Sequence, residues 1–128
     1  RQIDEEKILA TISRSRDSNL VTILCTADIG KTISGAKLEP DMIAIEPPEL
    51  IGGNISVSTA NPEIISETVS KVSEISSNIK ILCGAGVKTR DDVSKAFELG
   101  VDGILLASGV VLSDNPRKTL HELVLGIV

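Results

Sequence analysis

Residues 79–109 read IKILCGAGVKTRDDVSKAFELGVDGILLASG, which is the pattern of a strand, a helix and a second strand. Ile79–Cys83 is an apolar run of strand length, and Gly103–Ala107 is another. Between them, Thr89 is placed to cap a helix, with Asp92 three residues on, and Gly100 is placed to end it. Because no hairpin turn joins the two runs, the segment predicts parallel strands connected by a right-handed helical crossover.

The same alternation extends over the rest of the chain. Stretches with apolar residues at helical spacing and apolar runs of strand length follow one another on both sides of this unit. The other expected helices are Asp4–Ser15, Asp28–Ala36, Pro62–Ser76 and Pro116–Val128, and the other expected strands are Leu20–Thr26 and Met42–Ile45. The sequence therefore predicts an α/β fold with parallel strands in a single domain over residues 1–128.

The composition argues against several classes of function. The chain has 128 residues and a formal net charge of −5, which suits one domain with a real core. An aromatic content of 1% leaves almost no flat side chains to stack on bases, and an acidic chain without a Lys/Arg cluster is unlike a nucleic-acid binder. Every apolar run is broken well before the length that spans a bilayer, so no membrane segment is expected.

Cys25 and Cys83 are far apart in the sequence, and each lies in an apolar run. With a single His and no CxxC pair, the chain has no recognisable metal or redox motif. We therefore expect both cysteines to be buried, reduced thiols of a cytosolic protein. No apolar segment with basic flanks follows Arg1, so no secretory signal is expected.

The strand Met42–Ile45 ends directly in a carboxylate, Glu46. A carboxylate that directly follows an apolar strand lies in a partly desolvated position at the end of the sheet, and partial desolvation makes it a stronger base. The connection that follows runs to Asn61, about fifteen residues, which is long for a loop after a strand. Pro47 and Pro48 fix the backbone φ angles at the beginning of this connection, and Gly52–Gly53 makes its other side flexible. The sequence therefore predicts a flap that moves as a rigid segment between two hinges. An ordinary surface loop is the alternative.

Two later strands end in glycine-containing turns, Gly84–Gly86 and Ala107–Gly109. Small residues let backbone N–H groups approach an anion closely, and the loops after the last two strands of parallel barrels commonly hold phosphate. Because the net charge does not attract anions, binding would depend on these local dipoles. A single glycine-containing turn is typical of an ordinary connection between a strand and a helix. Two such turns after consecutive strands favour a phosphate-binding site.

Taken together, these stretches resemble archaeal-type triosephosphate isomerase. The resemblance is carried, in the family's order and spacing, by IEPPELIG at 45–52, VSTANPE at 57–63, ILCGAG at 81–86 and GILLASGVV at 103–111. The first stretch is the specific one, because many phosphate-binding barrels share the glycine turns. The resemblance spans essentially this whole chain but only the second half of the enzyme. The implied fold is therefore the second half of a TIM barrel, an open half-barrel of four parallel strands alternating with helices.

The resemblance implies a role for each of these positions. Glu46 would be the catalytic base that moves a proton between C1 and C2 of a triose phosphate, interconverting dihydroxyacetone phosphate and glyceraldehyde 3-phosphate. The flap over the substrate would contain Pro47, Pro48, Glu49, Leu50 and Gly53, together with the phosphate-binding residues Ile51 and Gly52. Further phosphate donors would be Gly86, Ala107 and Ser108. The resemblance implies no metal, no cofactor, and a cytoplasmic enzyme of glycolysis and gluconeogenesis.

The family's electrophilic His and its substrate-binding Asn and Lys belong to the first half of the barrel, which this sequence lacks. Arg1 matches the Arg that closely follows the family's Asn-His-Ser-Glu stretch, and His121, on the last expected helix, is badly placed to replace the missing His. We therefore expect the isolated chain to be inactive and to need the N-terminal half-barrel as its partner. The intact enzyme is expected to be a homo-oligomer, a tetramer or a dimer. An uncovered apolar inner face would leave the half-barrel alone marginally stable.

Two other interpretations stay open at this point. One is a different phosphate-binding barrel enzyme, such as a relative of thiamine-phosphate or indole-glycerol-phosphate synthases, which would share the glycine turns but not the Glu46-Pro47-Pro48 flap. The other is a non-catalytic phosphate-binding module with a flavodoxin-like open sheet, complete at this length and stable as a monomer.

Overall fold

The computed structural model describes residues 3–53 and 55–127 and places the four expected strands in one parallel sheet. The strands are β1 (Ile23–Thr26), β2 (Met42–Ile45), β3 (Lys80–Cys83) and β4 (Gly103–Ile104). They lie side by side in sequence order, β1-β2-β3-β4. This is the order of half a TIM barrel. A flavodoxin-like sheet would exchange the first two strands, so the structure contradicts that alternative.

The expected helices are present, and three short elements join them that the sequence pattern did not predict. The helices are α1 (Glu5–Asp17), α2 (Ile29–Ala36), α4 (Pro62–Ile75), α5 (Arg90–Glu98) and α7 (Pro116–Val124), which is followed by the 3₁₀ turn η2 (Leu125–Ile127). The unpredicted elements are the 3₁₀ turn η1 (Pro48–Leu50) and the single-turn helices α3 (Val57–Ala60) and α6 (Ser108–Val111). Each has only three or four residues, too few to show a helical repeat of apolar positions.

The ends of the elements follow local hydrogen bonds. Asp4 caps α1 through a bond from Lys7 N to its carboxylate (2.9 Å). The Thr89–Asp92 capping box of α5 is confirmed, because each residue accepts a hydrogen bond from the other's backbone. Asn61 precedes α4 and, as an Asn before Pro62, would be expected to cap it, but its side chain makes no cap hydrogen bond. Asn61 also ends α3, and its backbone N–H is bonded to Val57 O.

Strand ends also differ from the predicted bounds. The first strand begins at Ile23 rather than Leu20, because its partner begins only at Met42. The last strand stops at Ile104, well before Ala107. For both strands, the apolar run in the sequence is longer than the segment that pairs with a neighbouring strand.

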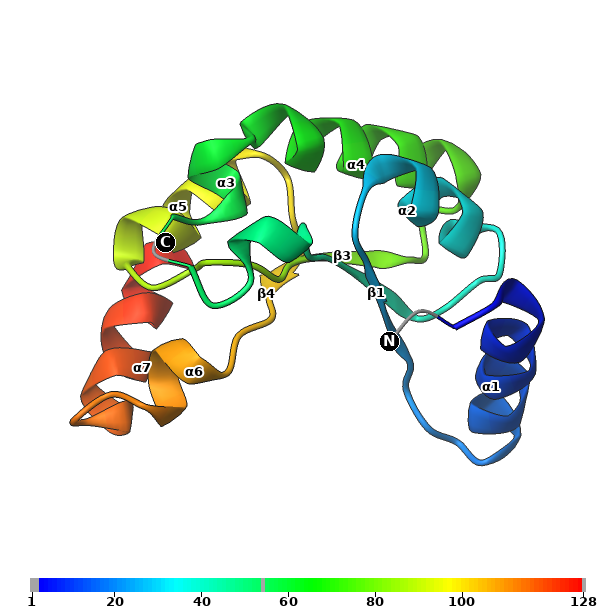
Figure 1. Ribbon diagram of the computed structural model, residues 1–128, viewed down its shortest axis with the longest axis horizontal. Helices are drawn as coiled ribbons and strands as arrows, with labels where there is room; N and C mark the ends of the chain where they lie inside the picture. Colours follow the sequence, from blue (N-terminus) through cyan, green and yellow to red (C-terminus); the bar gives the residue numbers. More distant parts are fainter. Residues whose placement is uncertain (1–2, 54, 128) are drawn as a thin grey trace.

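Helices cover one face of the sheet and leave the other open (Figure 1). In that view α2 and α4 lie above the strands, and α1 and the α6–α7 pair flank the opposite, concave side. Alternate strand residues point to the helices and form the core. The fully or nearly buried core residues from β2, β3, α4 and α5 are Ile43, Ile45, Ile81, Cys83, Ile65, Val72, Val93 and Ala96.

The concave face is apolar and incompletely covered. Ile23 points away from the helices, because its neighbour Leu24 packs against the core, and it is 45% exposed. Met42, Leu82 and Leu105 occupy the same face at the other strands and are half-buried. An apolar inner face open to solvent is what the second half of a barrel presents without its first half.

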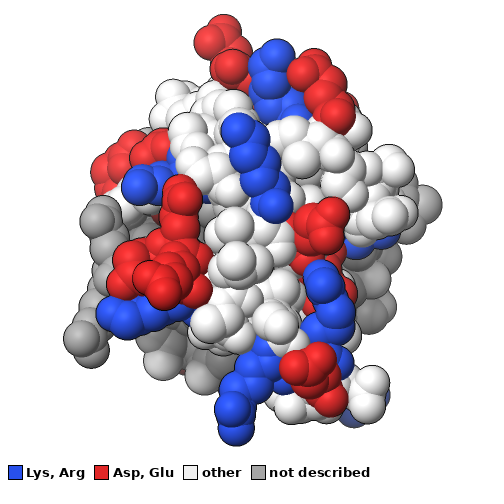
Figure 2. Space-filling view, turned by 90° about the vertical axis from the view of Figure 1, so that its right-hand side faces the viewer, with Lys and Arg blue, Asp and Glu red and all other residues white. Residues whose placement is uncertain are grey.

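The outer surface carries charges of both signs. Figure 2 shows Lys and Arg side chains interspersed with Asp and Glu on the side of the molecule that carries α1 and α2. Over residues 3–53 and 55–127, no helix is both long and apolar enough to cross a lipid bilayer.

We expect the two faces of the sheet to respond differently to the same substitution. Ile45→Ala removes a fully buried side chain and should lower the free energy of unfolding by about 3 kcal/mol, within the usual range for a core Ile→Ala change. Ile23→Ala, on the open face, should cost less than about 1 kcal/mol. Urea unfolding of this chain, followed by circular dichroism, measures both. Equal costs would show that the inner face is covered in solution and would contradict the open half-barrel.

Candidate functional site

A cavity of about 400 Å³ lies at the carboxyl ends of β2, β3 and β4. Parallel strands bring their carboxyl ends to one edge of a sheet, so segments far apart in the sequence meet there. The residues predicted as base or phosphate donors all line this cavity: Glu46, Ile51, Gly52, Gly86, Ala107 and Ser108. The apolar part of its wall includes Val87, Leu105 and Leu106, which the sequence analysis did not single out.

The loop after β2 enters the cavity only with its tip. Gly53 lines the cavity with Ile51 and Gly52, whereas the other predicted flap residues, Pro47, Pro48, Glu49 and Leu50, do not. Pro47 is fully buried and Leu50 packs against the core, so the beginning of the loop is fixed to the body of the protein. Gly52 has φ +72°, and a Cβ there would meet no atom within 4 Å. The tip thus projects freely, as a flap requires, and its closure stays a prediction.

Glu46 lies over a glycine that leaves room for its side chain. The strand end is held by hydrogen bonds from Glu46 N to Thr26 O (2.8 Å) and from Gly84 N to Ile45 O (3.1 Å). A Cβ on Gly84 would collide with Glu46 Cγ and come within 2.9 Å of Oε1. Gly84 therefore lets the carboxylate fold across the end of β3, where it is half-buried at the cavity wall.

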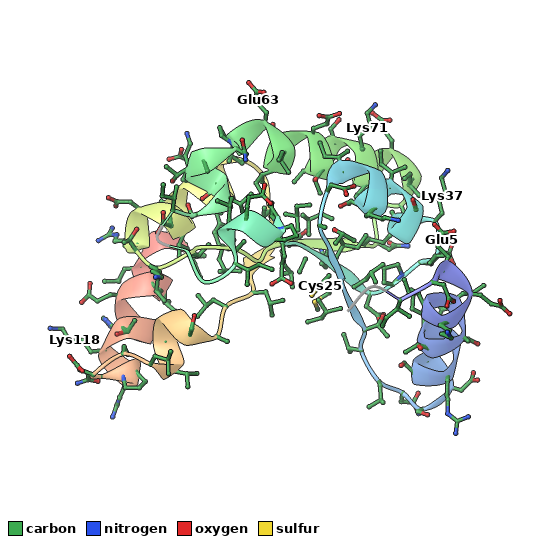
Figure 3. The ribbon with its side chains drawn as sticks, in the orientation of Figure 1. Glu5, Cys25, Lys37, Glu63, Lys71 and Lys118 are labelled. Atoms are coloured by element: carbon green, nitrogen blue, oxygen red, sulfur yellow. The ribbon has the colours of Figure 1, made fainter. Side chains whose placement is uncertain are left out.

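Cys25 lies beside Glu46, and its placement corrects one prediction. The residue is exposed, not buried, because it points to the open concave side of the sheet (Figure 3). Partial burial of its sulfur, hydrogen bonding to the Glu46 carboxylate and the charge of that carboxylate together raise the pKa of the Cys25 thiol to about 12. Cys83 points the other way, into the core as predicted, and burial raises the pKa of its thiol to about 11.

Two turns line the same cavity as Glu46. Gly86, in the turn after β3, has φ +71°, a backbone conformation that glycine adopts easily. In the other turn, the first hydrogen bonds of α6 run from Val110 N and Val111 N to Ala107 O. The N–H groups of Ser108 and Gly109 therefore have no acceptor within that helix. A Cβ on Gly109 would lie 3.2 Å from Val87 O, so the two turns are in contact. Together they form a surface of small residues that suits an anion.

Lys88, which follows the turn after β3, also lines the cavity. His121 is exposed on α7 and does not line the cavity. Arg1 is outside the described residues. Among the residues that the structure does describe, no group of three or more His, Cys, Asp or Glu side chains could hold a metal ion.

Sequence comparisons point to one family. The sequence model of the family described as "Triosephosphate isomerase" matches residues 2–124. A triosephosphate isomerase of Methanobacterium bryantii is 44% identical over 124 residues, which are 97% of this chain and 55% of that protein. That of Methanocaldococcus jannaschii is 48% identical over 117 residues, which are 91% of this chain and 53% of that protein. The chain thus spans about half the length of the curated relatives it matches.

Solved structures with a similar backbone show the fold alone. A thiamine phosphate pyrophosphorylase from Pyrococcus furiosus superposes with a TM-score of 0.68 at 18% identity, covering 91% of this chain and 52% of that one. An N-acetylmannosamine-6-phosphate 2-epimerase from Clostridium perfringens gives 0.64 at 14% identity, covering 94% and 49%. At such identities neither reaction extends to this chain. The family match favours an isomerase over the other phosphate-binding barrels that the glycine turns left open.

The contact between Cys25 and Glu46 predicts a measurable change in thiol reactivity. Glu46→Gln removes the negative charge beside the sulfur, so it should lower the pKa of the Cys25 thiol. A fall of about one unit raises the thiolate fraction at pH 9, and hence the alkylation rate by iodoacetamide, about tenfold. Peptide mass spectrometry of a time course measures the rate, with Cys83 as internal reference. Glu63→Gln, on the outward side of α4 (Figure 3), is the control. Unchanged alkylation in Glu46→Gln would rule out the contact.

Proposed function

This chain belongs to the triosephosphate isomerase family, and on that premise we propose that it is the part of a triosephosphate isomerase that carries the catalytic base and most of the phosphate site. The intact protein would interconvert dihydroxyacetone phosphate and glyceraldehyde 3-phosphate. The observation that carries the proposal is that Glu46, the flap tip and both glycine-containing turns line one cavity. That arrangement suits a substrate with an acidic carbon at one end and a phosphate at the other.

In the proposed reaction Glu46 acts on the carbon next to the carbonyl group. Its carboxylate takes a proton from C1 of the ketone and returns it to C2, while a hydroxyl proton moves between the two oxygens, so the carbonyl group moves from C2 to C1. The half-buried position of Glu46 suits this role, because a base with little water around it competes well for a weakly acidic proton. The enediolate oxygens formed midway need a hydrogen-bond donor, which the family's first barrel half supplies through its His.

The substrate phosphate would lie against the backbone amides of the two turns that line the cavity. Gly86, Ala107 and Ser108 offer amides on a surface without bulky side chains. Closing the flap would bring the amides of Ile51 and Gly52 onto the same phosphate and exclude water from the reacting carbons. The cavity has no net positive lining to attract the substrate over a distance, so affinity would depend on these close contacts.

The partners follow from the same proposal. The missing half-barrel would cover the apolar concave face around Ile23, Met42 and Leu82 and pair with the free edges of β1 and β4. The completed barrel would assemble into a homo-oligomer, a tetramer or a dimer, and would work in the cytoplasm without a cofactor.

Activity should depend on both halves and on Glu46. We expect no isomerisation by this chain alone, and conversion of glyceraldehyde 3-phosphate once it is joined to the segment of the Methanobacterium bryantii relative that it does not match. Glu46→Gln in the joined protein should lower kcat by about 10²–10⁴, the usual contribution of a positioned base. Glu63→Gln is the matched control. Full activity of Glu46→Gln would remove this residue from the mechanism, and measurable activity of the chain alone would contradict the need for a second half.

The room that Gly84 leaves for Glu46 gives a second test in the same joined protein. Gly84→Ala should reduce kcat about as strongly as Glu46→Gln, because the added methyl group collides with the Glu46 side chain and displaces it. Gly103→Ala is the control on the neighbouring strand, where the methyl group would meet only the flexible tip of Leu82, at 3.0 Å. Steady-state kinetics, measured on variants with similar melting temperatures, distinguish the effects of the two substitutions on kcat. Equal kcat values for both variants would show that Gly84 has no role in placing the carboxylate.

A further inference from the structure

The cavity at the strand ends has charged side chains of opposite sign. Among the described residues that line it, only Glu46 and Lys88 carry a charge. Glu46 directly follows β2, whereas Lys88 follows the turn after β3, residues 84–87, which we call the anion turn. The two charges cancel in sum but not in position, so a ligand with a charge at one end meets a different field at each of them.

The backbone of Lys88 is held in place beside the cavity. Lys88 N donates to Asp92 Oδ2 (3.1 Å), in the first turn of α5. The anion turn before it is fixed as well, because Val57 N donates to Ala85 O (3.0 Å). Neither bond involves an atom of the lysine side chain. The point from which that side chain extends is therefore set by the backbone alone.

The stem of the Lys88 side chain lies beside the second turn at the cavity. A Cβ on Gly109 would lie 3.8 Å from Lys88 Cγ and 3.2 Å from Val87 O. The methylene groups of the lysine thus pass the turn that carries Ala107 and Ser108, two of the proposed phosphate donors. The residue is exposed, as expected for a lysine whose stem packs against a surface while its charged end stays in water. The ammonium group can therefore reach a ligand held by both turns.

Neighbouring basic residues do not share this position. Arg90 and Lys118 line a separate, outer cavity of about 610 Å³, and neither lines the cavity at the strand ends. Lys88 is the one described residue that lines both cavities. It therefore lies on the boundary between them, and its charge is the only basic one in the described lining of the cavity that contains Glu46.

We propose that Lys88 is a phosphate-binding residue of this site, which attracts and orients the phosphate end of the substrate. The inference rests on the proposed function and deepens it, because it adds a side-chain cation to the backbone amides. A phosphate group beside Glu46 would be repelled by the carboxylate, whereas beside Lys88 it is attracted. The two charges together favour the orientation that brings the reacting carbons, and not the phosphate, to the base.

The test uses the joined protein of the previous subsection. Lys88→Gln should raise KM for glyceraldehyde 3-phosphate and the inhibition constant of inorganic phosphate about fivefold, as expected for the loss of one exposed ion pair, with little change in kcat. Lys88→Arg keeps the charge and should stay within about twofold of the wild type. Arg90→Gln removes the same charge two positions on, outside this cavity, and should change neither constant more than about twofold.

A substrate without a phosphate separates phosphate binding from a general distortion of the site. Glyceraldehyde has the same reacting carbons, so Lys88→Gln should leave its kcat/KM unchanged. The variant should fold, because the bond to Asp92 uses a backbone N–H that glutamine also has. If kcat/KM falls equally for both substrates, or if KM and the phosphate constant stay unchanged, the inference is wrong. Equal effects of Arg90→Gln would attribute the change to net charge and would also contradict it.

Calorimetric titration of the joined protein and its variants with inorganic phosphate keeps the two proposals apart. Phosphate binding that weakens in Lys88→Gln, without isomerisation by the wild type, would contradict the proposed reaction and support the inference. Isomerisation by a wild type whose phosphate binding does not depend on Lys88 would support the reaction and contradict the inference. A wild type that neither binds phosphate nor isomerises would contradict both.

Discussion

The parallel register of β2, β3 and β4 is the constraint on which the site depends. Ile45 lies beside Cys83, and the residues that follow these two positions are the carboxylate and the first glycine of the anion turn. A shift of one residue would turn Glu46 toward the helices and Ile45 toward the cavity, because side chains alternate between the faces of a strand. The buried side chains of Ile43 and Ile45 prevent that shift. The packing of the core thus sets the direction of the base.

The open concave face and the cavity at the strand ends have a common origin. In a barrel of this kind the site is built at the carboxyl ends of the strands, and the inner face is filled by side chains from all eight strands. Dividing the barrel leaves the four strand ends of one half together, so their cavity wall persists. Four strands supply only half of the side chains that fill the interior of such a barrel, and Ile23 is exposed here. A half-barrel can therefore present its residues in position while lacking the groups that complete the reaction.

The sequence was a good guide wherever a few neighbouring residues determine the structure. The helix caps at Asp4 and Thr89 depend on bonds within one turn, and the apolar runs of β2 and β3 are buried on the helix side. The six residues proposed as base and phosphate donors line one cavity, because parallel strands must end at one edge. The roles assigned to these six residues came from the flap sequence and from the resemblance. No argument from composition or periodicity could have given those roles.

The features that sequence missed arise from contacts between segments distant in the chain. Cys25 sits in an apolar run typical of a buried strand, yet it is exposed because it points to the open concave face of the sheet. Ser58 and Asp92 are 34 positions apart, yet Ser58 Oγ donates a hydrogen bond to the backbone carbonyl oxygen of Asp92 (3.1 Å). The segment that carries Ser58 can pass close to the turn after β3 only because Gly86 has no side chain, since a Cβ there would collide with Ile55 O. A glycine that a pattern attributes to phosphate binding thus also lets the far end of the loop after β2 pass close to the turn after β3.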